Sequence, residues 1–390
     1  MSSAISHKSN TLASGQQIKE EGLVEKIKKL QLSNGPSLTD FDEKKASIVY
    51  QAKKVSTVTN VHRDDIHAAI KLSDRTFITG SKDGCLKKWD FNGKLIKTVY
   101  NNPKINYKSW ITALVALGDS FWLSGTRDGY VHQWNTKGKL EKQLNVVPYF
   151  DGMHQCKQRN IKRVNCLSAF PSSDSPGNHI FFAGWHTHFT THHLEYDKRI
   201  RYSVADQNDW VYAIQSISTT ALLVITGPRL DHWERSSSSS YEWKEKTHLI
   251  QPPKDDCHPK KTHFISAITP LRSSKQHFGL SVFDGSIRVY DIEAQKIIMK
   301  AREHEKRVWT IENITEYCFG SCGDDGLIKI WDIRTPSKSL LTLKDNEKQK
   351  ARVSILLHIE DNLLLSGSCP VDIKNSANKA QFSFWDIRKV

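Results

Sequence analysis

The sequence lacks any apolar run close to the roughly 18 residues that a membrane-spanning helix requires, and only 38 % of its 390 residues are hydrophobic. Its first residues, MSSAISHKSNTLASGQQ, have no apolar stretch behind the basic ones, so they do not resemble a secretory signal. Cysteine is scarce: the 7 cysteines are scattered without a CxxC pair, which argues against a disulfide framework. We therefore expect a soluble protein of the cytoplasm, with the nucleus as the alternative compartment.

Sequence motifs of enzyme chemistry are also missing, because the chain has no phosphate-binding loop, no GxSxG elbow and no HExxH helix. Histidines gather at 186–193, but His188 and His192 would lie roughly 13 Å apart on an extended strand and could not close on one ion. A second group of metal-ligating types comprises Asp255, Asp256, Cys257, His258 and His263. This group also lacks the paired spacing of a zinc site. We predict no catalytic residues, no cofactor and no bound metal.

Positive charge is in excess and is unevenly distributed. The chain has 56 lysines and arginines against 42 acidic residues, a net charge of +14. Residues 46–150 contain 16 basic and 8 acidic side chains and so contribute +8 of this total. A positive sector favours acidic partners through long-range attraction. The alternative is that these lysines only keep the surface solvated.

The chain repeats one short pattern. In four segments an Asp-Gly pair is followed, 6 residues after the Asp, by an aromatic residue. The segments run from Asp83 to Trp89, Asp128 to Trp134, Asp284 to Tyr290, and Asp325 to Trp331. An Asp-Gly pair between alternating apolar residues predicts a tight hairpin, because glycine adopts positive φ and aspartate bonds the local backbone. The aromatic residue then falls on the second strand of that hairpin.

A second series of short β-branched segments gives the number of repeats. These segments start at Ile66, Ile111, Val164, Val211, Ile265, Val308 and Val353. Their mostly small third residue suits an innermost strand that is crowded near the centre of a ring. The matching third strands lie near Trp89, Trp134, His193, Trp233, Tyr290, Trp331 and Trp385. The spacing between successive inner strands leaves room for four strands in each unit. Such a unit predicts the blade of a β-propeller.

These residues resemble the WD-repeat β-propeller family, and the resemblance covers residues 46–390. It implies an all-β fold, a seven-bladed propeller. After the third strand of the last blade, residues 382–387, only 3 residues remain, too few for a fourth strand. We expect residues 47–57, just before the first blade, to supply the missing outer strand and close the ring. Such closure removes the exposed edges of the sheets.

In that family a His, a Ser or Thr, the turn Asp and the Trp hold a blade together. The first blade has His62, Thr79, Asp83 and Trp89, and the sixth has His304, Ser321, Asp325 and Trp331. A buried indole, hydroxyl, imidazole and carboxylate satisfy one another, whereas any one alone would be costly. The resemblance therefore gives these tetrads a structural role. Blades three, four and seven depart from the pattern at their hairpins.

The first 45 residues differ from the rest, since they are polar and rich in serine. Within them, residues 22–32 place Leu23, Ile27 and Leu30 on one helical face. We predict a flexible, mostly disordered segment over 1–45 with one short amphipathic helix, followed by a propeller domain over 46–390. The helix either packs on the propeller or binds a partner.

The main functional hypothesis is a non-enzymatic scaffold that binds a peptide or an acidic or phosphorylated protein segment. The candidate surface is the face on which the inner strands begin. The candidate residues are Asp65, His67, Trp110, Arg163, Trp210, Tyr212, Phe264, Arg307, Trp309 and Arg352. Aromatic residues with arginine are typical of interaction hot spots, and arginine suits carboxylate or phosphate. The alternative is that some of these aromatics only pack against neighbouring blades.

Two other partner classes stay open. Trp-Asp-Ile-Arg occurs twice, ending at Arg334 and Arg388, and resembles the signature by which some WD-repeat proteins dock on a cullin-ring ubiquitin ligase adaptor. A substrate receptor of such a ligase is therefore one alternative. The other is an RNA- or DNA-associated propeller that uses the basic sector of blades one and two. Its candidate residues are Lys53, Lys54, Lys87, Lys88, Lys94 and Lys97.

Overall fold

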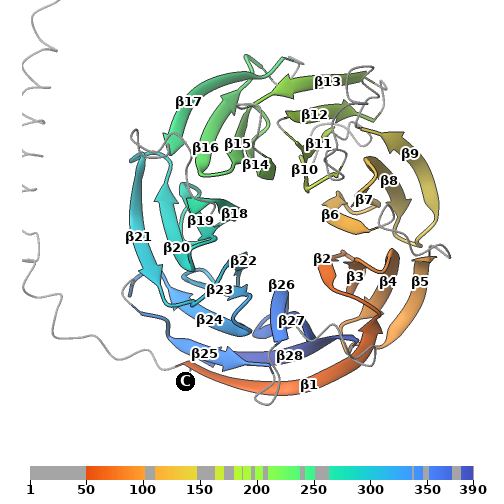
Figure 1. Ribbon diagram of the computed structural model, residues 1–390, viewed down its shortest axis with the longest axis vertical. Helices are drawn as coiled ribbons and strands as arrows, with labels where there is room; N and C mark the ends of the chain where they lie inside the picture. The colour runs from red at the N-terminus through yellow and green to blue at the C-terminus, as the bar shows by residue number, and fades with distance from the viewer. Residues whose placement is uncertain are drawn as a thin grey trace, which may run out of the picture. The chain divides into compact units, whose positions relative to one another are not determined.

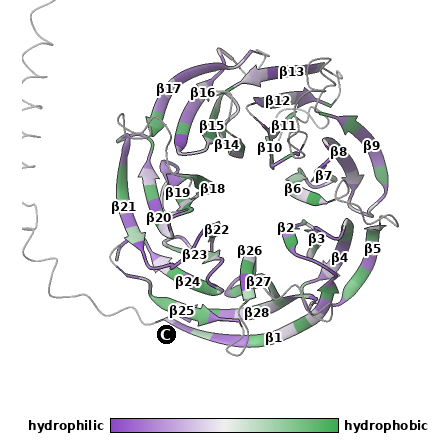
Figure 2. Ribbon diagram, in the orientation of Figure 1, coloured by the Kyte–Doolittle hydropathy of each residue, from purple (hydrophilic) through white to green (hydrophobic). Residues whose placement is uncertain are grey.

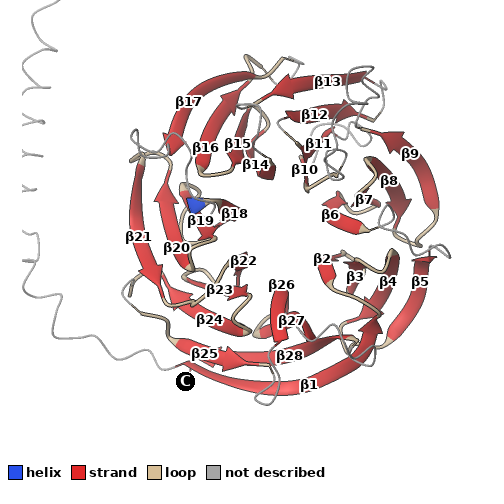
Figure 3. Cartoon of the chain, in the orientation of Figure 1, coloured by secondary structure: helices blue, strands red, loops and turns tan. Residues whose placement is uncertain are grey.

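A computed structural model gives the structure of the protein. It describes residues 50–101, 110–146, 163–170, 180–186, 188–194, 198–204, 210–237, 242–250, 263–335, 338–345, 351–370 and 379–389. Within these ranges every extended regular element is a β-strand, with a single 3₁₀ position at His263 (Figure 3). No helix in these ranges is long and apolar enough to span a membrane. The helix predicted at 22–32 lies outside the described residues.

Seven four-stranded sheets surround a common centre, as the blades of a ring (Figure 1). Blade 1 has β2 (Ile66–Lys71), β3 (Thr76–Ser81), β4 (Cys85–Asp90) and β5 (Leu95–Asn101). Blade 2 has β6 (Ile111–Leu117), β7 (Phe121–Thr126), β8 (Tyr130–Asn135) and β9 (Leu140–Asn145). Blade 3 has β10 (Cys166–Ala169), β11 (Ile180–Trp185), β12 (His188–His193) and β13 (Lys198–Ser203). Blade 4 has β14 (Val211–Ser218), β15 (Ala221–Thr226), β16 (Arg229–Glu234) and β17 (Lys244–Ile250).

The remaining blades follow the same order from the centre outward. Blade 5 has β18 (Ile265–Pro270), β19 (His277–Val282), β20 (Ser286–Asp291) and β21 (Lys296–Arg302). Blade 6 has β22 (Val308–Asn313), β23 (Cys318–Gly323), β24 (Leu327–Asp332) and β25 (Leu341–Lys344). Blade 7 has β26 (Ala351–Glu360), β27 (Leu363–Pro370) and β28 (Ala380–Lys389), joined by β1 (Tyr50–His62). The seven predicted inner strands and the seven predicted third strands are all confirmed.

Strand β1 closes the ring. It pairs antiparallel with β28 as the outermost strand of blade 7, with Tyr50 opposite Lys389 and His62 opposite Ala380. The predicted closure is therefore confirmed. The strand ends later than the predicted 47–57. It continues to His62, the first residue of the blade 1 tetrad.

The inner strands also close the ring at its centre. Strand β2 contacts both β6 and β26, so the first and last blades are neighbours. Hydroxyl groups on inner strands add hydrogen bonds from blade to blade. Ser266 Oγ donates to the carbonyl oxygen of Val308 at 2.6 Å, and Ser354 Oγ donates to that of Ile66 at 2.6 Å. The second bond joins blade 7 to blade 1, so closure has both an inner and an outer component.

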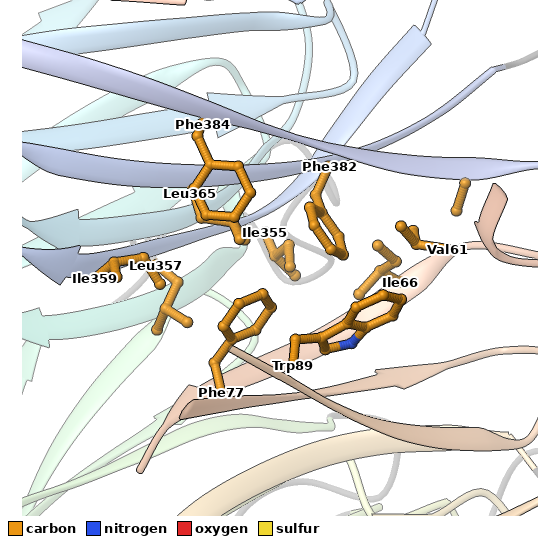
Figure 4. Packing of buried hydrophobic residues seen from close by; sticks show 11 residues of the cluster. Val61, Ile66, Phe77, Trp89, Ile355, Leu357, Ile359, Leu365, Phe382 and Phe384 are labelled. Atoms are coloured by element: carbon orange, nitrogen blue, oxygen red, sulfur yellow. The ribbon is translucent and has the colours of Figure 1, made fainter. Parts of the chain in front are cut away.

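Hydrophobic side chains are buried between neighbouring blades. Figure 4 shows the layer between blades 7 and 1, where Phe382 and Phe384 of β28 lie near Phe77 of β3 and Trp89 of β4. The ring centroid of Phe382 lies 5.6 Å from that of Phe77 and 5.0 Å from that of Trp89, both edge to face. Outer strands such as β5 and β21 mix hydrophobic and hydrophilic residues along their length (Figure 2). Thin layers of this kind explain the low apolar fraction of the chain.

Two glycines allow neighbouring blades to approach closely. A Cβ atom at Gly80 would lie 2.5 Å from Cγ2 of Ile111, the first residue of the next inner strand. A Cβ atom at Gly125 would lie 2.7 Å from Cγ1 of Val164, which stands just before the inner strand β10 of the next blade. A larger residue at either place would push the blades apart. The sequence analysis did not single out these glycines, although each precedes a turn aspartate by three positions.

The blade 1 tetrad is a chain of hydrogen bonds that starts at Trp89. Its Nε1 donates to Thr79 Oγ1 at 2.8 Å, and the Thr79 hydroxyl donates to His62 Nε2 at 2.8 Å. His62 Nδ1 then donates to Asp83 Oδ2 at 3.1 Å. Burial lowers the pKa of His62, which keeps the imidazole neutral with one donor and one acceptor. Although burial opposes it, the hydrogen bond from His62 lowers the pKa of Asp83 to about 2.

Blade 6 repeats this chain of hydrogen bonds with the residues of its own tetrad. Trp331 Nε1 donates to Ser321 Oγ at 2.8 Å, and His304 contacts Ser321 Oγ and Asp325 Oδ2, each at 2.8 Å. Blades 2 and 7 keep only the bond between tryptophan and serine. These bonds join Trp134 to Ser124 at 2.9 Å and Trp385 to Ser366 at 2.8 Å.

Asp345, between β25 and β26, stabilises the strands of blade 7 where the ring closes. Its buried carboxylate accepts hydrogen bonds from Lys54 Nζ at 2.8 Å and Gln381 Nε2 at 3.1 Å, and from the hydroxyls of Ser368 and Ser383. Burial alone would raise the pKa of Asp345, but these donors lower it. One carboxylate therefore connects β1, β27 and β28.

Candidate interaction face

One backbone hydrogen bond recurs in four blades and sets the geometry of the candidate surface. The amide of the residue after the second strand donates to the carbonyl oxygen of the residue before the inner strand. The pairs are Lys82 with Asp65, Arg127 with Trp110, Phe283 with Phe264, and Asp324 with Arg307, at 2.9 to 3.0 Å. Because equivalent positions of every blade face the same side of the ring, these pairs lie on one surface. We call this surface, together with the predicted residues at the starts of the inner strands, the inner-strand face.

Arg307 lies between two aromatic rings on this face. Its guanidinium carbon is 3.8 Å from the ring centroid of Phe283 and 4.8 Å from that of Trp309. Trp309 is itself fixed, because its Nε1 donates to Asp324 Oδ1 at 2.7 Å. The stacking orients the guanidinium, and its N–H groups make no hydrogen bond with the part of the chain that the structure describes. An oriented arginine of this kind suits a carboxylate or phosphate ligand.

Other predicted aromatic residues extend this group or pack elsewhere. The ring centroids of Tyr212 and Phe264 lie 5.6 and 6.1 Å from that of Phe283. Trp210 instead meets the ring of His186 edge to face, with centroids 5.2 Å apart. Blades 4 to 6 therefore form an aromatic half of the inner-strand face.

Cationic side chains gather around Trp110 on the other half. Lys82 Nζ lies 4.9 Å and the Arg127 guanidinium carbon 3.9 Å from its ring centroid, and the His67 ring lies 6.0 Å away. Burial, with the charges of Arg163, Lys82 and Arg127, lowers the pKa of His67 to about 3. Burial and the nearby Arg127 lower the pKa of Arg163 to about 10. Blades 1 to 3 therefore form a cationic half.

Asp65 and Arg352 neutralise each other. The Asp65 carboxylate is buried, accepts a hydrogen bond from Arg352 Nε at 3.2 Å and forms an ion pair with the same guanidinium. Since Asp65 belongs to blade 1 and Arg352 to blade 7, the pair also joins these blades. Both residues lie at the starts of inner strands, but each neutralises the charge of the other.

Four residues of the face were missed by the sequence analysis: Lys82, Arg127, Phe283 and Asp324. Each directly precedes an aspartate-glycine pair, so the repeat that located the turns would also have located them. The pattern was interpreted as a turn signal only. These four residues belong to the inner-strand face only because the turn lies beside the start of the inner strand. The backbone hydrogen bonds show that it does.

Aromatic stacking accounts for two blade 3 histidines. The His188 ring stacks on Trp185 with centroids 4.8 Å apart, and the His192 ring stacks on Phe181 at 4.6 Å. His192 Nε2 also lies 3.0 Å from Thr190 Oγ1. The second predicted cluster, residues 255–258, lies outside the described residues.

Within the described ranges, one group of metal-ligand types converges in blade 4, at Asp231, Glu245 and His248. Arg229 already occupies its middle. Arg229 Nη2 lies 3.1 Å from Asp231 Oδ2, 3.4 Å from Glu245 Oε1 and 3.2 Å from His248 Nδ1. The guanidinium thus provides the positive charge that a metal ion would otherwise supply.

Both Trp-Asp-Ile-Arg arginines are partly exposed. The side chain of Arg334 is 40 % exposed and that of Arg388 is 68 % exposed. Each donates from Nε to the aspartate of its own motif at 2.9 Å, Arg334 to Asp332 and Arg388 to Asp386. Arg334 also lies over the Tyr317 ring, 4.4 Å from its centroid. A pocket of about 270 Å³ beside Arg334 is lined among others by Tyr50, Cys318 and Ile387.

Four of the six lysines predicted to form a basic sector have hydrogen-bond partners in the ring, among them the exposed Lys97, which donates to the carbonyl of Lys137 at 3.3 Å. Lys54 donates to Asp345 at 2.8 Å, Lys87 to the carbonyl of Val61 at 2.6 Å, and Lys88 to Asp74 at 2.6 Å. Lys53, Lys94 and Lys97 are exposed. A nucleic-acid backbone is bound by a continuous row of cations, and three scattered lysines provide less than that.

Known proteins match the chain in sequence and in structure. The model of the family described as "WD domain, G-beta repeat" matches residues 53–90 and 295–332, the two segments with complete tetrads. The chain is 33 % identical to Protein SPA1-RELATED 3 of Arabidopsis thaliana over 61 residues, 15 % of this chain and 7 % of that protein. It is 32 % identical to p21-activated protein kinase-interacting protein 1-like of Danio rerio over 98 residues, 24 % of this chain and 26 % of that protein. The matched segments thus span only 7 % and 26 % of the lengths of these two relatives.

A solved structure matches nearly the whole ring. The crystal structure of the WD40 beta propeller domain of Doa1 superposes with a TM-score of 0.61 at 14 % sequence identity. The match covers 86 % of this chain and 96 % of that one. This likeness shows a common fold.

Proposed function

The chain is a WD-repeat β-propeller, and from this premise we propose that it is a non-enzymatic scaffold that binds an acidic or phosphorylated protein segment on its inner-strand face. Propellers of this family typically hold proteins together. The zebrafish relative is named for its interaction with a protein kinase, which is in keeping with such a role. A cytoplasmic location, with the nucleus as the alternative, stays a prediction.

The observation that carries the proposal is the stacking of Arg307 between Phe283 and Trp309. Interaction hot spots are enriched in tryptophan, tyrosine and arginine, because large rings exclude water and a fixed guanidinium binds an anion with little loss of entropy. The neighbouring Tyr212 and Phe264 add apolar surface for an anchor residue of the ligand. The cationic half around Trp110 supplies the complementary charge.

Reversal of Arg307 to Glu should weaken protein binding at least about 30-fold, because truncating a desolvated charge pair costs roughly 2 kcal/mol or more. The measurement is quantitative mass spectrometry of proteins captured by the tagged full chain and by the variant. Lys94→Glu is the matched control, since it makes the same charge change at an exposed position directly before β5. It should mainly slow association at low salt. Normal capture by Arg307→Glu, with loss in Lys94→Glu, would move the site to the outer basic edge.

A second candidate function, substrate receptor of a cullin-ring ubiquitin ligase, is favoured by the exposure of Arg334 and Arg388. The two differ in what their removal would do. Asp332 is buried, so Arg334→Ala would leave an unpaired carboxylate in the interior, whereas Asp386 is partly exposed. Arg334→Lys keeps the charge and loses the fork of N–H donors. It is therefore the better probe at that position.

The variant with both Arg334→Lys and Arg388→Ala should keep its stability within about 1 kcal/mol. If the ligase hypothesis is right, a ligase adaptor co-purifies with the unmodified chain and at least about tenfold less with the variant. Affinity purification of both proteins from the same cells provides the comparison. Absence of any adaptor from the unmodified sample would end this hypothesis.

A further inference from the structure

The cationic half of the inner-strand face concentrates charge at one place. Lys82 follows β3 in blade 1, Arg127 follows β7 in blade 2 and Arg163 precedes β10 in blade 3, and these blades are neighbours in the ring (Figure 1). Lys82 and Arg127 both lie within 5 Å of the Trp110 ring centroid, and all three cations act electrostatically on His67. Like charges are brought together here against their repulsion.

Two carboxylates of blade 1 beside this group, those of Asp64 and Asp65, form ion pairs. Asp64 pairs with Lys82 at 3.3 Å, and its side chain is partly exposed. Asp65 pairs with Arg352 of blade 7. Neither carboxylate is paired with Arg163. The charge of Arg163 is thus not matched by either of these two carboxylates.

Two buried polar atoms in this group have no partner. Arg163 Nε and His67 Nε2 are inaccessible to water and make no hydrogen bond with the described residues. Burying such atoms without partners is unfavourable, and native proteins keep them mainly where a ligand or another function requires them. His67 belongs to β2 of blade 1 and Arg163 precedes β10 of blade 3, and the charge of Arg163 acts on His67, so both residues belong to one group.

We propose that Arg163, Arg127 and Lys82, with His67 beside them, form a seat for one phosphate group on a protein ligand, with Arg163 as its principal contact. The proposal rests on the proposed function, since it names the chemistry that the inner-strand face recognises. Phosphate fits better than carboxylate because it carries close to two negative charges and three acceptor oxygens, which match three cations. A protein ligand fits better than a nucleic acid because the other half of the face is aromatic and not a continuing row of cations.

The proposal separates binding from stability. Among the described residues the half-buried Arg163 has no carboxylate partner, so replacing it with a neutral side chain of similar length should not lower stability. A purely structural arginine would behave in the opposite way, since its removal would leave partners unpaired. Arg163→Met should therefore melt at the same temperature as the unmodified protein, or higher, while losing its response to phosphate.

The experiment uses the full chain with inorganic phosphate as the probe. Melting temperatures are measured in 10 mM phosphate, acetate or chloride at equal ionic strength, so that screening is held constant. With a dissociation constant of about 1 mM, phosphate should raise the melting temperature of the unmodified protein by about 3 °C. Arg163→Met should show no rise, whereas Lys94→Met, which removes the same charge at an exposed position directly before the outer strand β5, should show the full rise.

Several results would overturn the inference. Destabilisation of Arg163→Met in chloride would show that the guanidinium already has a partner, and a persisting phosphate response would show that it is not the contact. An equal rise with acetate would exclude a seat for phosphate. A larger rise with a short single-stranded oligonucleotide than with a phosphoserine peptide, at equal phosphate concentration, would reassign the site to nucleic acid.

The outcome is independent of the test of the proposed function. Normal protein capture by Arg307→Glu, together with a phosphate response that depends on Arg163, would retain the seat and reject the scaffold proposal in its present form. Loss of capture by Arg307→Glu without any phosphate response would reject the seat alone.

Discussion

Deletion of residues 1–60 should lower the melting temperature by about 10 °C or more, whereas deletion of residues 1–40 should leave it within about 1 °C. The longer deletion removes β1 except for Val61 and His62 and so takes away the outer strand of blade 7. Backbone donors and acceptors of β28 would then face water along the whole edge. The buried Asp345 would lose Lys54, one of its hydrogen-bond donors. Thermal unfolding of the two truncated proteins measures the difference.

A peptide of residues 47–62 provides the control for this deletion. If the missing strand is the cause, the peptide should bind the shortened ring and recover most of the lost melting temperature, because strand addition restores both pairing and apolar contacts. The same peptide should have no effect on the protein that lacks only residues 1–40. Equal melting temperatures for the two deletions would contradict closure by β1.

Replacement of Trp331 by Ala should destabilise the protein by about 3 to 5 kcal/mol. The Trp331 side chain is fully buried in blade 6, so its loss leaves a large cavity between sheets. Its Nε1 is also the donor to Ser321 Oγ, and without it the hydrogen-bond chain through His304 to Asp325 loses its first member. Urea unfolding, with the free energy extrapolated to water, is the appropriate measurement.

The variant Trp331→Phe separates the cavity from the hydrogen bond. It keeps most of the ring volume and loses the donor to Ser321, so we expect about 1 to 2 kcal/mol of destabilisation. Ser321→Ala in the Trp331→Phe background should cost about 1 kcal/mol or more in addition, since it also removes the hydrogen-bond partner of His304 Nε2. A loss below about 1 kcal/mol for Trp331→Ala would mean that the tetrad does not hold blade 6 together.

Local spacing made the fold predictable. Blades 1 to 6 consist of consecutive antiparallel strands, so the β-branched inner strands, with the Asp-Gly turns of four blades, mark each blade within a short stretch of sequence. The closing strand was predictable for another reason, because the last blade had no residues left for a fourth strand. Its end at His62 was not, since nothing in the sequence interrupts the strand before the tetrad histidine.

The pairing of side chains between the first and last parts of the chain was not predictable. Asp65 and Arg352 are 287 positions apart in the sequence, and Lys54 and Asp345 are 291 apart. Composition places both lysine and arginine among candidate ligand-binding residues, but only the meeting of the first and last blades shows that each has a carboxylate partner. Arg307 and Arg163 differ from these residues. The neighbours of Arg307 are aromatic, and a neighbour of Arg163 is the cation Arg127.

Blade 4 shows a further limit of the sequence pattern. Its hairpin departs from the family, and the sequence predicted only that the tetrad would be weakened. The structure instead has a different polar core, in which buried Asp231 binds Arg229 and His248. The same requirement, that a buried carboxylate be satisfied, is met there by other residues.

The pairing of β1 with β28 also sets the time at which the protein can fold. Tyr50 and its partner Lys389 are separated by almost the whole propeller, and a ribosome that adds 5 to 20 residues each second needs on the order of 20 to 70 seconds to make that stretch. During this interval β1 has been synthesised and has no strand to pair with. Its exposed edge includes Val55, Val58 and the aromatic Tyr50, which favour pairing with other chains. The nascent chain is therefore most in need of chaperones before blade 7 emerges, and the ring is completed only after nearly all of it has left the ribosome.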